Sequence, residues 1–211
     1  MDTNKRLVRR LVNTAGTTYA EEAGIRINDK PMPLFQLLVL CMLASKPIDA
    51  ATAMRAAREL FRAGLRTPKA VLAADRRTII DAFGRAHYVR YDESSATRLI
   101  AIAEAVNTDY AGDLRAMARR SGHDKRSATR LLKQFKGIGD TGADIFLREV
   151  QDVWTWVRPY FDDRATSAAK EVGLPADPKR LSALAPRANA RLAAALVRAT
   201  LDDDVRQQVA G

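Results

Sequence analysis

The clearest binding motif in the chain is a short glycine turn, Lys136-Gly137-Ile138-Gly139. Gly137 and Gly139 let the backbone turn sharply and bring bare amides close to an anion, while Ile138 can anchor the turn in the core. Because a helix is predicted directly after the turn, the same amides would lie at the positive end of a helix dipole, which favours phosphate. Such contacts read no base sequence, so we expect the turn to bind a nucleic-acid backbone.

Basic residues surround this turn. Lys and Arg number 35 in 211 residues against 25 Asp and Glu, and the net charge of +10 favours a polyanionic partner, although biased genome composition would produce the same excess. Arg126, Arg130 and Lys133 fall at helical spacings on one face, which is typical of a solvated face or of a DNA-binding one. We therefore predict that double-stranded DNA is contacted by Arg126, Arg130, Lys133, Lys136, Gly137, Ile138, Gly139 and Thr141.

Several kinds of site and location are excluded by residue usage. The single cysteine, Cys41, allows neither a disulfide framework nor a four-thiolate iron-sulfur cluster. His87 and His123 stand apart from other ligand types, so neither a metal nor a cofactor is predicted. The apolar segment 34–44 is too short to span a bilayer, and the N-terminus lacks a signal-peptide pattern. We expect a monomeric cytoplasmic protein, associated with the nucleoid and without a membrane partner.

Helix-forming patterns occur through most of the chain and predict an all-α fold. Ala, Leu, Arg and Glu recur every three or four residues, and alternating β-branched segments are scarce. Pro31 and Pro33 introduce an apolar helix over 34–44, which we expect at the centre of the core. A second helix is expected to begin near Asp49, and Thr67 and Asp75 are expected to cap the two helices that follow.

A polar and aromatic loop over 85–92 precedes a long helix predicted over 94–106. Its two tyrosines, Tyr88 and Tyr91, have two interpretations. They pack partly into the core with their hydroxyls in water, or they contact a nucleic-acid base. The sequence leaves both interpretations open.

The order of these elements resembles the helix-hairpin-helix and Gly/Pro/Asp superfamily of DNA glycosylases, typified by endonuclease III. The resemblance covers residues 31–174 and rests on Gly137, Gly139, Pro159 and Asp162. Members place an apolar helix early, then short helices, the hairpin, a Pro-containing loop and an aspartate that begins the next helix. The resemblance implies two helical domains, one of residues 31–150 and one of residues 1–30 and 151–211, with the active cleft between them.

The same resemblance places Asp162 on the family's catalytic aspartate, with Asp163 as an alternative one residue away. In the family this carboxylate lies at a helix N-terminus, stabilises the cationic sugar and helps water to attack it. A helix dipole keeps such a carboxylate ionised, ready to stabilise positive charge. Aspartate is also among the best helix caps, so Asp162 or Asp163 equally suits a plain helix start.

Two departures from the family restrict what the resemblance implies. Thr141 stands where bifunctional members carry a nucleophilic lysine, and it cannot form a Schiff base, so strand cleavage is not expected. Ser45 stands near the family's polar wedge and is too short to fill the gap left by a flipped base. Lys46, Tyr88 or Tyr91 would have to take that role in the lesion pocket.

The expected function is that of a base-excision-repair DNA glycosylase without lyase activity. Such an enzyme hydrolyses the N-glycosidic bond of a damaged base in duplex DNA, here with Asp162. The chief alternative is a catalytically inactive DNA-binding protein of the same fold. A helical transcription regulator is a further alternative, and the sequence does not specify which base would be removed.

Overall fold

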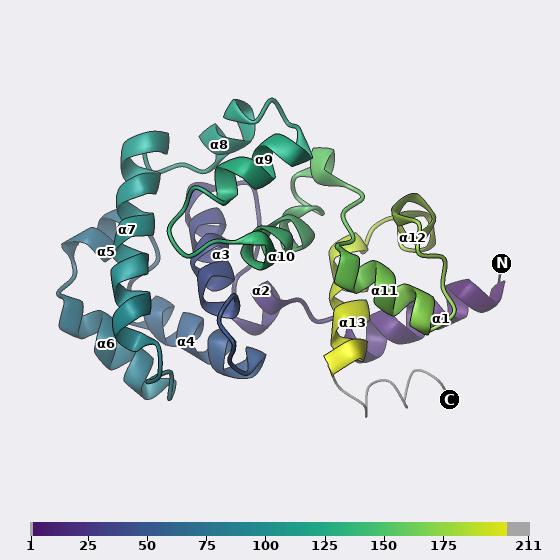
Figure 1. Cartoon of the computed structure of the whole chain (residues 1–211), viewed down its shortest axis with the longest axis horizontal. Helices are drawn as coiled ribbons and strands as arrows, with labels where there is room; N and C mark the ends of the chain where they lie inside the picture. Colours follow the sequence, from purple (N-terminus) through teal and green to yellow (C-terminus); the bar gives the residue numbers. More distant parts are fainter. Residues whose placement is uncertain (1, 202–211) are drawn as a thin grey trace. The chain divides into compact units, whose positions relative to one another are not determined.

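The computed structural model describes residues 2–201, and every regular element in that part of the chain is a helix (Figure 1). The predicted all-α class is therefore confirmed. None of the described helices is both long and apolar enough to cross a membrane. The chain divides into two compact units, a central unit (Ala20–Phe146) and a terminal unit (Met1–Tyr19 with Leu147–Gly211), with the single turn α2 (Tyr19–Glu22) at one boundary.

The core of the central unit is built on α3 (Pro31–Ala44). Residues Pro33 to Leu43 are buried on every side of the helix, as expected of a helix that is apolar all round. α4 (Ala50–Arg62) and α7 (Asp92–Tyr110) pack against it. The predicted central position of this segment is confirmed, and the helix begins earlier than predicted because proline is well suited to a first turn.

The next three helices begin where the sequence predicts, and one of the two predicted caps, Thr67, makes its bond. The Asp49 side chain accepts a backbone hydrogen bond of 3.1 Å and starts α4. Thr67 accepts one of 3.2 Å and starts α5 (Pro68–Ala73). Asp75 stands directly before α6 (Arg76–Arg85), but its side chain makes no capping hydrogen bond there with the described residues. The predicted helix start at Asp75 is therefore correct, but the predicted capping hydrogen bond from the Asp75 side chain is not formed in the described part of the chain.

The second half of the central unit carries the predicted glycine turn. α7 extends beyond the predicted 94–106 and ends where Ala111 adopts the left-handed conformation. It is followed by α8 (Arg115–Arg120), α9 (Lys125–Leu132) and α10 (Asp140–Val150). The division between the two units falls inside α10.

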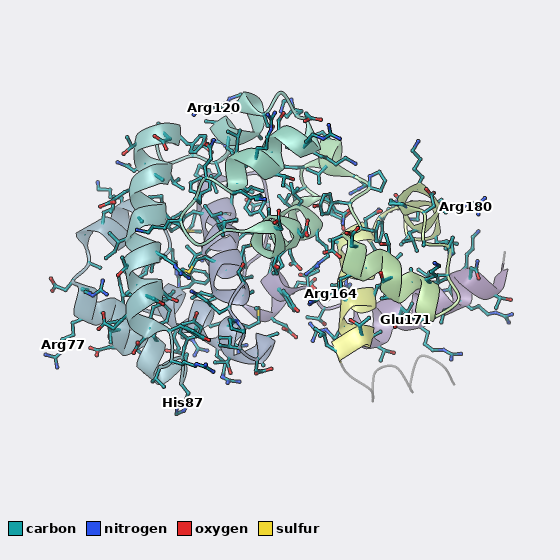
Figure 2. All side chains as sticks on the ribbon, in the orientation of Figure 1. Arg77, His87, Arg120, Arg164, Glu171 and Arg180 are labelled. Carbon is teal, nitrogen blue, oxygen red and sulfur yellow. The ribbon has the colours of Figure 1, made fainter. Side chains whose placement is uncertain are left out.

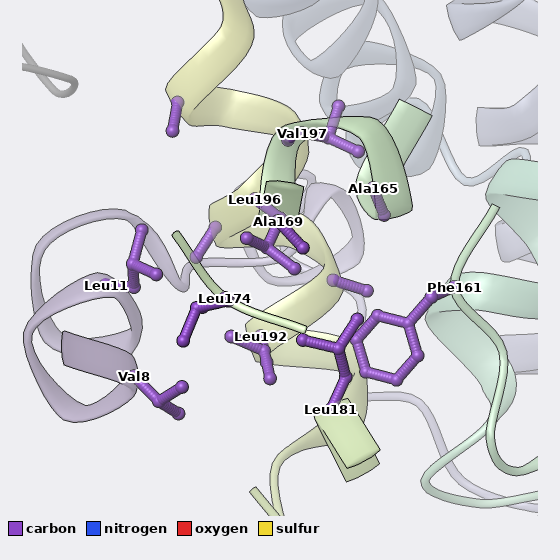
Figure 3. Close-up of a cluster of buried hydrophobic side chains, with 14 of the residues drawn as sticks. Val8, Leu11, Phe161, Ala165, Ala169, Leu174, Leu181, Leu192, Leu196 and Val197 are labelled. Carbon is purple, nitrogen blue, oxygen red and sulfur yellow. The ribbon is translucent and has the colours of Figure 1, made fainter. Parts of the chain in front are cut away.

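The terminal unit consists of helices from both ends of the chain. These are α1 (Asp2–Ala15), α11 (Asp163–Glu171), α12 (Pro178–Leu184) and α13 (Asn189–Leu201), with a short 3-10 helix at Thr155–Val157. α13 packs against both α1 and α11. Their shared core is apolar and includes Val8, Leu11, Phe161, Ala165, Ala169, Leu181, Leu192 and Leu196 (Figure 3). Burial of Phe161 in this core fixes the backbone immediately before Asp162.

Candidate functional site

The glycine turn joins α9 to α10 as a helix, turn and helix. Asp124 caps α9 by accepting the Ser127 amide at 2.7 Å, and this hydrogen bond lowers the pKa of the Asp124 carboxyl below its usual 3.8. After α9 the amide of Ile138 donates to the Phe135 carbonyl at 3.0 Å. The Ile138 side chain is only 5% exposed, so it anchors the turn in the core as predicted.

The first amides of α10 lie at the end of the turn. The Gly139 carbonyl accepts the bond from the Ala143 amide at 3.0 Å. The amides of Asp140, Thr141 and Gly142 precede this bond, so their own helix offers them no carbonyl. They lie at the positive end of the α10 dipole, where an anion is stabilised. Thr141 itself is exposed at this helix start.

The glycines of this segment serve different purposes. Gly137 has a φ of +95°, and a Cβ there would come within 2.8 Å of the Cδ of Arg98. A Cβ at Gly142 would come within 2.7 Å of the Oγ of Ser45. At Gly139 a Cβ would meet nothing within 4 Å, and φ lies outside the left-handed region. A side chain at position 139 would therefore fit the fold while standing beside the first amides of α10.

An open hollow of about 430 Å³ lies beside the turn, within the central unit. It is lined by the end of α3, by one residue of α7 and by the turn itself: Ser45, Arg98, Gly137, Ile138, Gly139, Asp140 and Thr141. Ser45 and Thr141, which the sequence treats as separate departures from the family, thus border the same space. Arg98 was not predicted, because periodicity along α7 does not reveal which residue faces a turn formed much later in the chain.

The predicted cations lie on the surface near this turn. Arg126, Arg130, Lys133 and Lys136 are all exposed, as the helical spacing indicates. The Lys133 ammonium forms an ion pair of 2.5 Å with Asp140, and this pair was not foreseen. Both partners are well exposed, so the pair contributes little stability and Lys133 can exchange Asp140 for a phosphate at small cost.

The residues proposed for a lesion pocket or wedge separate into two groups. Ser45 donates its hydroxyl to the Cys41 carbonyl at 2.6 Å and borders the hollow. The Lys46 ammonium lies 5.3 Å from the centre of the Tyr91 ring, a cation–π contact outside the hollow lining. Lys46 and Tyr91 therefore do not line the hollow that Ser45 borders.

Tyr88 lies in the core of the central unit. Its side chain is 2% exposed, its ring centre is 5.0 Å from that of Phe83, and its hydroxyl lies 3.1 Å from the Ser95 hydroxyl. Burial raises the pKa of the Tyr88 hydroxyl, and the Ser95 hydrogen bond opposes this shift. The position of Tyr88 agrees with the core packing of the first interpretation, but its hydroxyl is buried beside Ser95 and does not lie in water.

Asp162 caps α11 and is also part of a buried ion pair. Its Oδ1 accepts the Ala165 amide at 2.8 Å, and its Oδ2 accepts the Nη1 of Arg148 at 2.5 Å. The side chains of Arg148 and Asp162 are only 4% and 6% exposed. Asp163, the alternative catalytic residue, is exposed in the first turn of the helix. Both carboxylate oxygens of Asp162 are therefore occupied by donors from its own unit.

Arg148 is the residue near Asp162 that the sequence did not reveal. Burial alone lowers the pKa of its guanidinium, but the charges of Asp162 and Glu149 and the hydrogen bond to Asp162 produce a net upward shift. The Tyr19 ring lies 5.7 Å from the guanidinium carbon. Arg148 therefore stays charged, and it neutralises the carboxylate that the family resemblance identifies as catalytic.

The described residues include no group of three or more His, Cys, Asp or Glu placed to hold a metal ion. Cys41, the single cysteine, is buried in α3. Comparison of the chain with protein-family models, with curated proteins and with solved structures finds no match.

Proposed function

We propose that the chain is a duplex DNA-binding protein of the helix-hairpin-helix type. The observation that carries the proposal is the hollow beside the glycine turn, which is bordered by the start of α10 and by Arg98. Unpaired amides, a helix dipole and a guanidinium favour phosphate, and none of them distinguishes one base from another. The exposed cations Arg126, Arg130 and Lys136 extend this positive surface along α9 and into the turn.

The surroundings of Asp162 favour binding without glycosidic hydrolysis. A carboxylate stabilises a cationic sugar best when its own charge is not already balanced. The Asp162 charge is balanced by Arg148, and its second oxygen serves the cap of α11. The catalytically inactive alternative is therefore our first proposal for the chemistry of this chain.

A monofunctional glycosylase is the second candidate, and two observations favour it. The hollow has the volume of a small-molecule pocket, which lies in the range of roughly 300–1,000 Å³. Asp162 stands at a helix N-terminus, as the resemblance to the glycosylase family implies. In this candidate the Arg148 guanidinium must release an oxygen of Asp162 before that carboxylate can act on a sugar.

The binding proposal is tested with a substitution that the fold should tolerate. Gly139→Val places a branched side chain beside the first amides of α10, at a position where an added Cβ meets nothing within 4 Å. Gly84→Val is the matched control, because Gly84 is exposed on α6 and also has open space at its Cβ. We expect Gly139→Val to weaken binding to duplexes of any sequence about tenfold or more, because charge-assisted hydrogen bonds to phosphate are blocked.

The control Gly84→Val is expected to bind like wild type. Equal affinity of Gly139→Val and Gly84→Val would remove the turn from the interface. A wild-type chain that does not bind duplex DNA at low salt would overturn the proposed function itself. Strong preference for one sequence in undamaged DNA would instead favour a transcription regulator.

The two candidates are separated by a panel of duplexes that carry different damaged bases. Alkali-labile sites formed by wild type and lost in Asp162→Asn, but kept in the exposed control Asp163→Asn, would establish the glycosylase. The first proposal expects no such sites with any duplex. Borohydride trapping of wild type on the same duplexes should give no adduct, because Thr141 provides no amine.

A further inference from the structure

Arg98 is the only arginine among the residues that line the hollow beside the glycine turn. It lies on α7, is partly buried, and directs the start of its side chain along Gly137. No carboxylate in the described part of the chain forms an ion pair with it. Arg98 is thus a partly desolvated cation that faces an open space.

Two other arginines of the central unit are each paired with an acid, whereas the partly buried Arg58 donates to the backbone carbonyl of Glu22 at 3.0 Å. Arg115 pairs with Asp113 at 2.8 Å, and Arg85 pairs with Glu59 at 3.1 Å. Partial burial removes water from a charged group, and this costs free energy unless a counter-charge replaces the water. The carboxylate of Asp140 also lines the hollow, but it is paired with Lys133 at 2.5 Å, so Arg98 has room for an anionic partner that enters through the hollow.

The fit between Arg98 and the turn depends on Gly137. A Cβ at that position would come within 2.8 Å of the Arg98 Cδ and 3.5 Å of its Cγ. Because Gly137 has no side chain, the methylene groups of Arg98 can lie against its backbone. The contact places the base of the side chain against the turn, and Arg98 borders the hollow together with Gly139 and Thr141.

We propose that Arg98 is a DNA-binding residue that holds a backbone phosphate at this hollow, together with the amides of the turn. The proposal rests on the proposed DNA-binding function and adds a contact from α7 to it. A guanidinium carries a positive charge and offers a planar fork of hydrogen-bond donors that matches a phosphate. The Thr141 hydroxyl offers a single donor and no charge. Arg98 would thus supply positive charge at this position without the nucleophilic chemistry of a lysine.

The experiment compares Arg98→Gln with Arg77→Gln, which removes the same charge from an outer position of the same unit. The Arg77 side chain is 91% exposed on α6 and stands away from the rest of the unit (Figure 2). Affinity for a fluorescent duplex is measured at several salt concentrations, after thermal unfolding has shown that each variant is folded. We expect Arg98→Gln to weaken binding about tenfold and to reduce the slope of log affinity against log salt by about 0.9.

Arg77→Gln should keep the wild-type affinity and slope. If Arg98→Gln and Arg77→Gln bind alike while Gly139→Val is weakened, the role of Arg98 is overturned and the proposed function stands. If wild type itself fails to bind duplex DNA, the proposed function has failed. These two failures are therefore distinguishable.

A second measurement uses the unmodified protein, so it does not depend on the folding of a variant. Arginines are labelled with phenylglyoxal with and without saturating duplex, and the modified peptides are identified by mass spectrometry. Duplex should slow the labelling of Arg98 at least severalfold and leave that of Arg77 unchanged. Equal rates of Arg98 labelling in both samples would overturn the proposal.

Discussion

Removal of the buried Arg148 guanidinium is expected to destabilise the terminal unit strongly. Arg148→Met keeps a long unbranched side chain but leaves the Asp162 carboxylate buried with only the Ala165 amide as a donor. Loss of one partner of a buried ion pair costs about 3–5 kcal/mol, because the remaining charge is neither hydrated nor compensated. For a chain of this size, that corresponds to a melting temperature lowered by roughly 6–20 °C.

The neutral partner substitution should recover much of this loss. Asp162→Asn keeps a side chain that can cap α11. It also removes the negative charge that Arg148→Met would leave buried without a partner. The double variant should therefore be more stable than the sum of the two single losses predicts, with a coupling free energy of about 1–3 kcal/mol. Urea unfolding of wild type, both single variants and the double variant gives this coupling directly.

A second arginine–aspartate pair in the terminal unit provides the control. Arg158 and Asp152 are 2.7 Å apart, but their side chains are 25% and 27% exposed, so water compensates each charge in part. Arg158→Met is expected to cost about 1 kcal/mol. Similar losses for Arg148→Met and Arg158→Met, or a coupling near zero between Arg148 and Asp162, would refute the reasoning from burial.

Three further predictions concern the central unit. Asp49→Ala should lower the free energy of unfolding by about 1 kcal/mol and Asp75→Ala by clearly less, since only Asp49 makes a capping bond; urea unfolding compares them. Gly142→Ala should cost about 1 kcal/mol by crowding the Ser45 hydroxyl, and adding Ser45→Ala should recover it in the same assay. Because its folded pKa is lowered, the Asp124 cap stabilises fully above its usual pKa of 3.8 and is lost as pH falls further; acid unfolding should therefore be less steep in Asp124→Asn.

Local sequence signals predicted the helices of the central unit well. Pro31 and Thr67 act within one helical turn, so their effect is visible without knowledge of the fold. The glycine turn is local in the same sense, because the turn needs a residue in the left-handed conformation and Gly137 adopts it with a φ of +95°. Asp75 shows the limit, since a suitable residue at a helix start does not guarantee that its side chain turns toward the amides.

Arg98 and Arg148, on which our proposals depend, could not be predicted in this way. Arg148 lies in the last turn of α10, where a basic residue ordinarily meets solvent and the helix dipole. Its burial depends on Asp162, which the chain brings to it only after a loop and a 3-10 helix. Arg98 likewise acquires its place from the later turn at Gly137. Periodicity indicates which face of a helix is polar, but tertiary packing decides what that face meets.

The charge partners of Asp162 and Arg98 favour DNA binding over hydrolysis of a glycosidic bond as the proposed function. A group that acts on a substrate must have a charge or a lone pair that the protein has not already used. The carboxylate of Asp162 is occupied by Arg148 and by its own helix, whereas Arg98 has no acidic partner among the described residues. Among the described residues, the carboxylate of Asp162 is thus balanced by an arginine and the guanidinium of Arg98 is not balanced by an acid, which agrees with our proposal that the chain binds DNA without cutting a glycosidic bond.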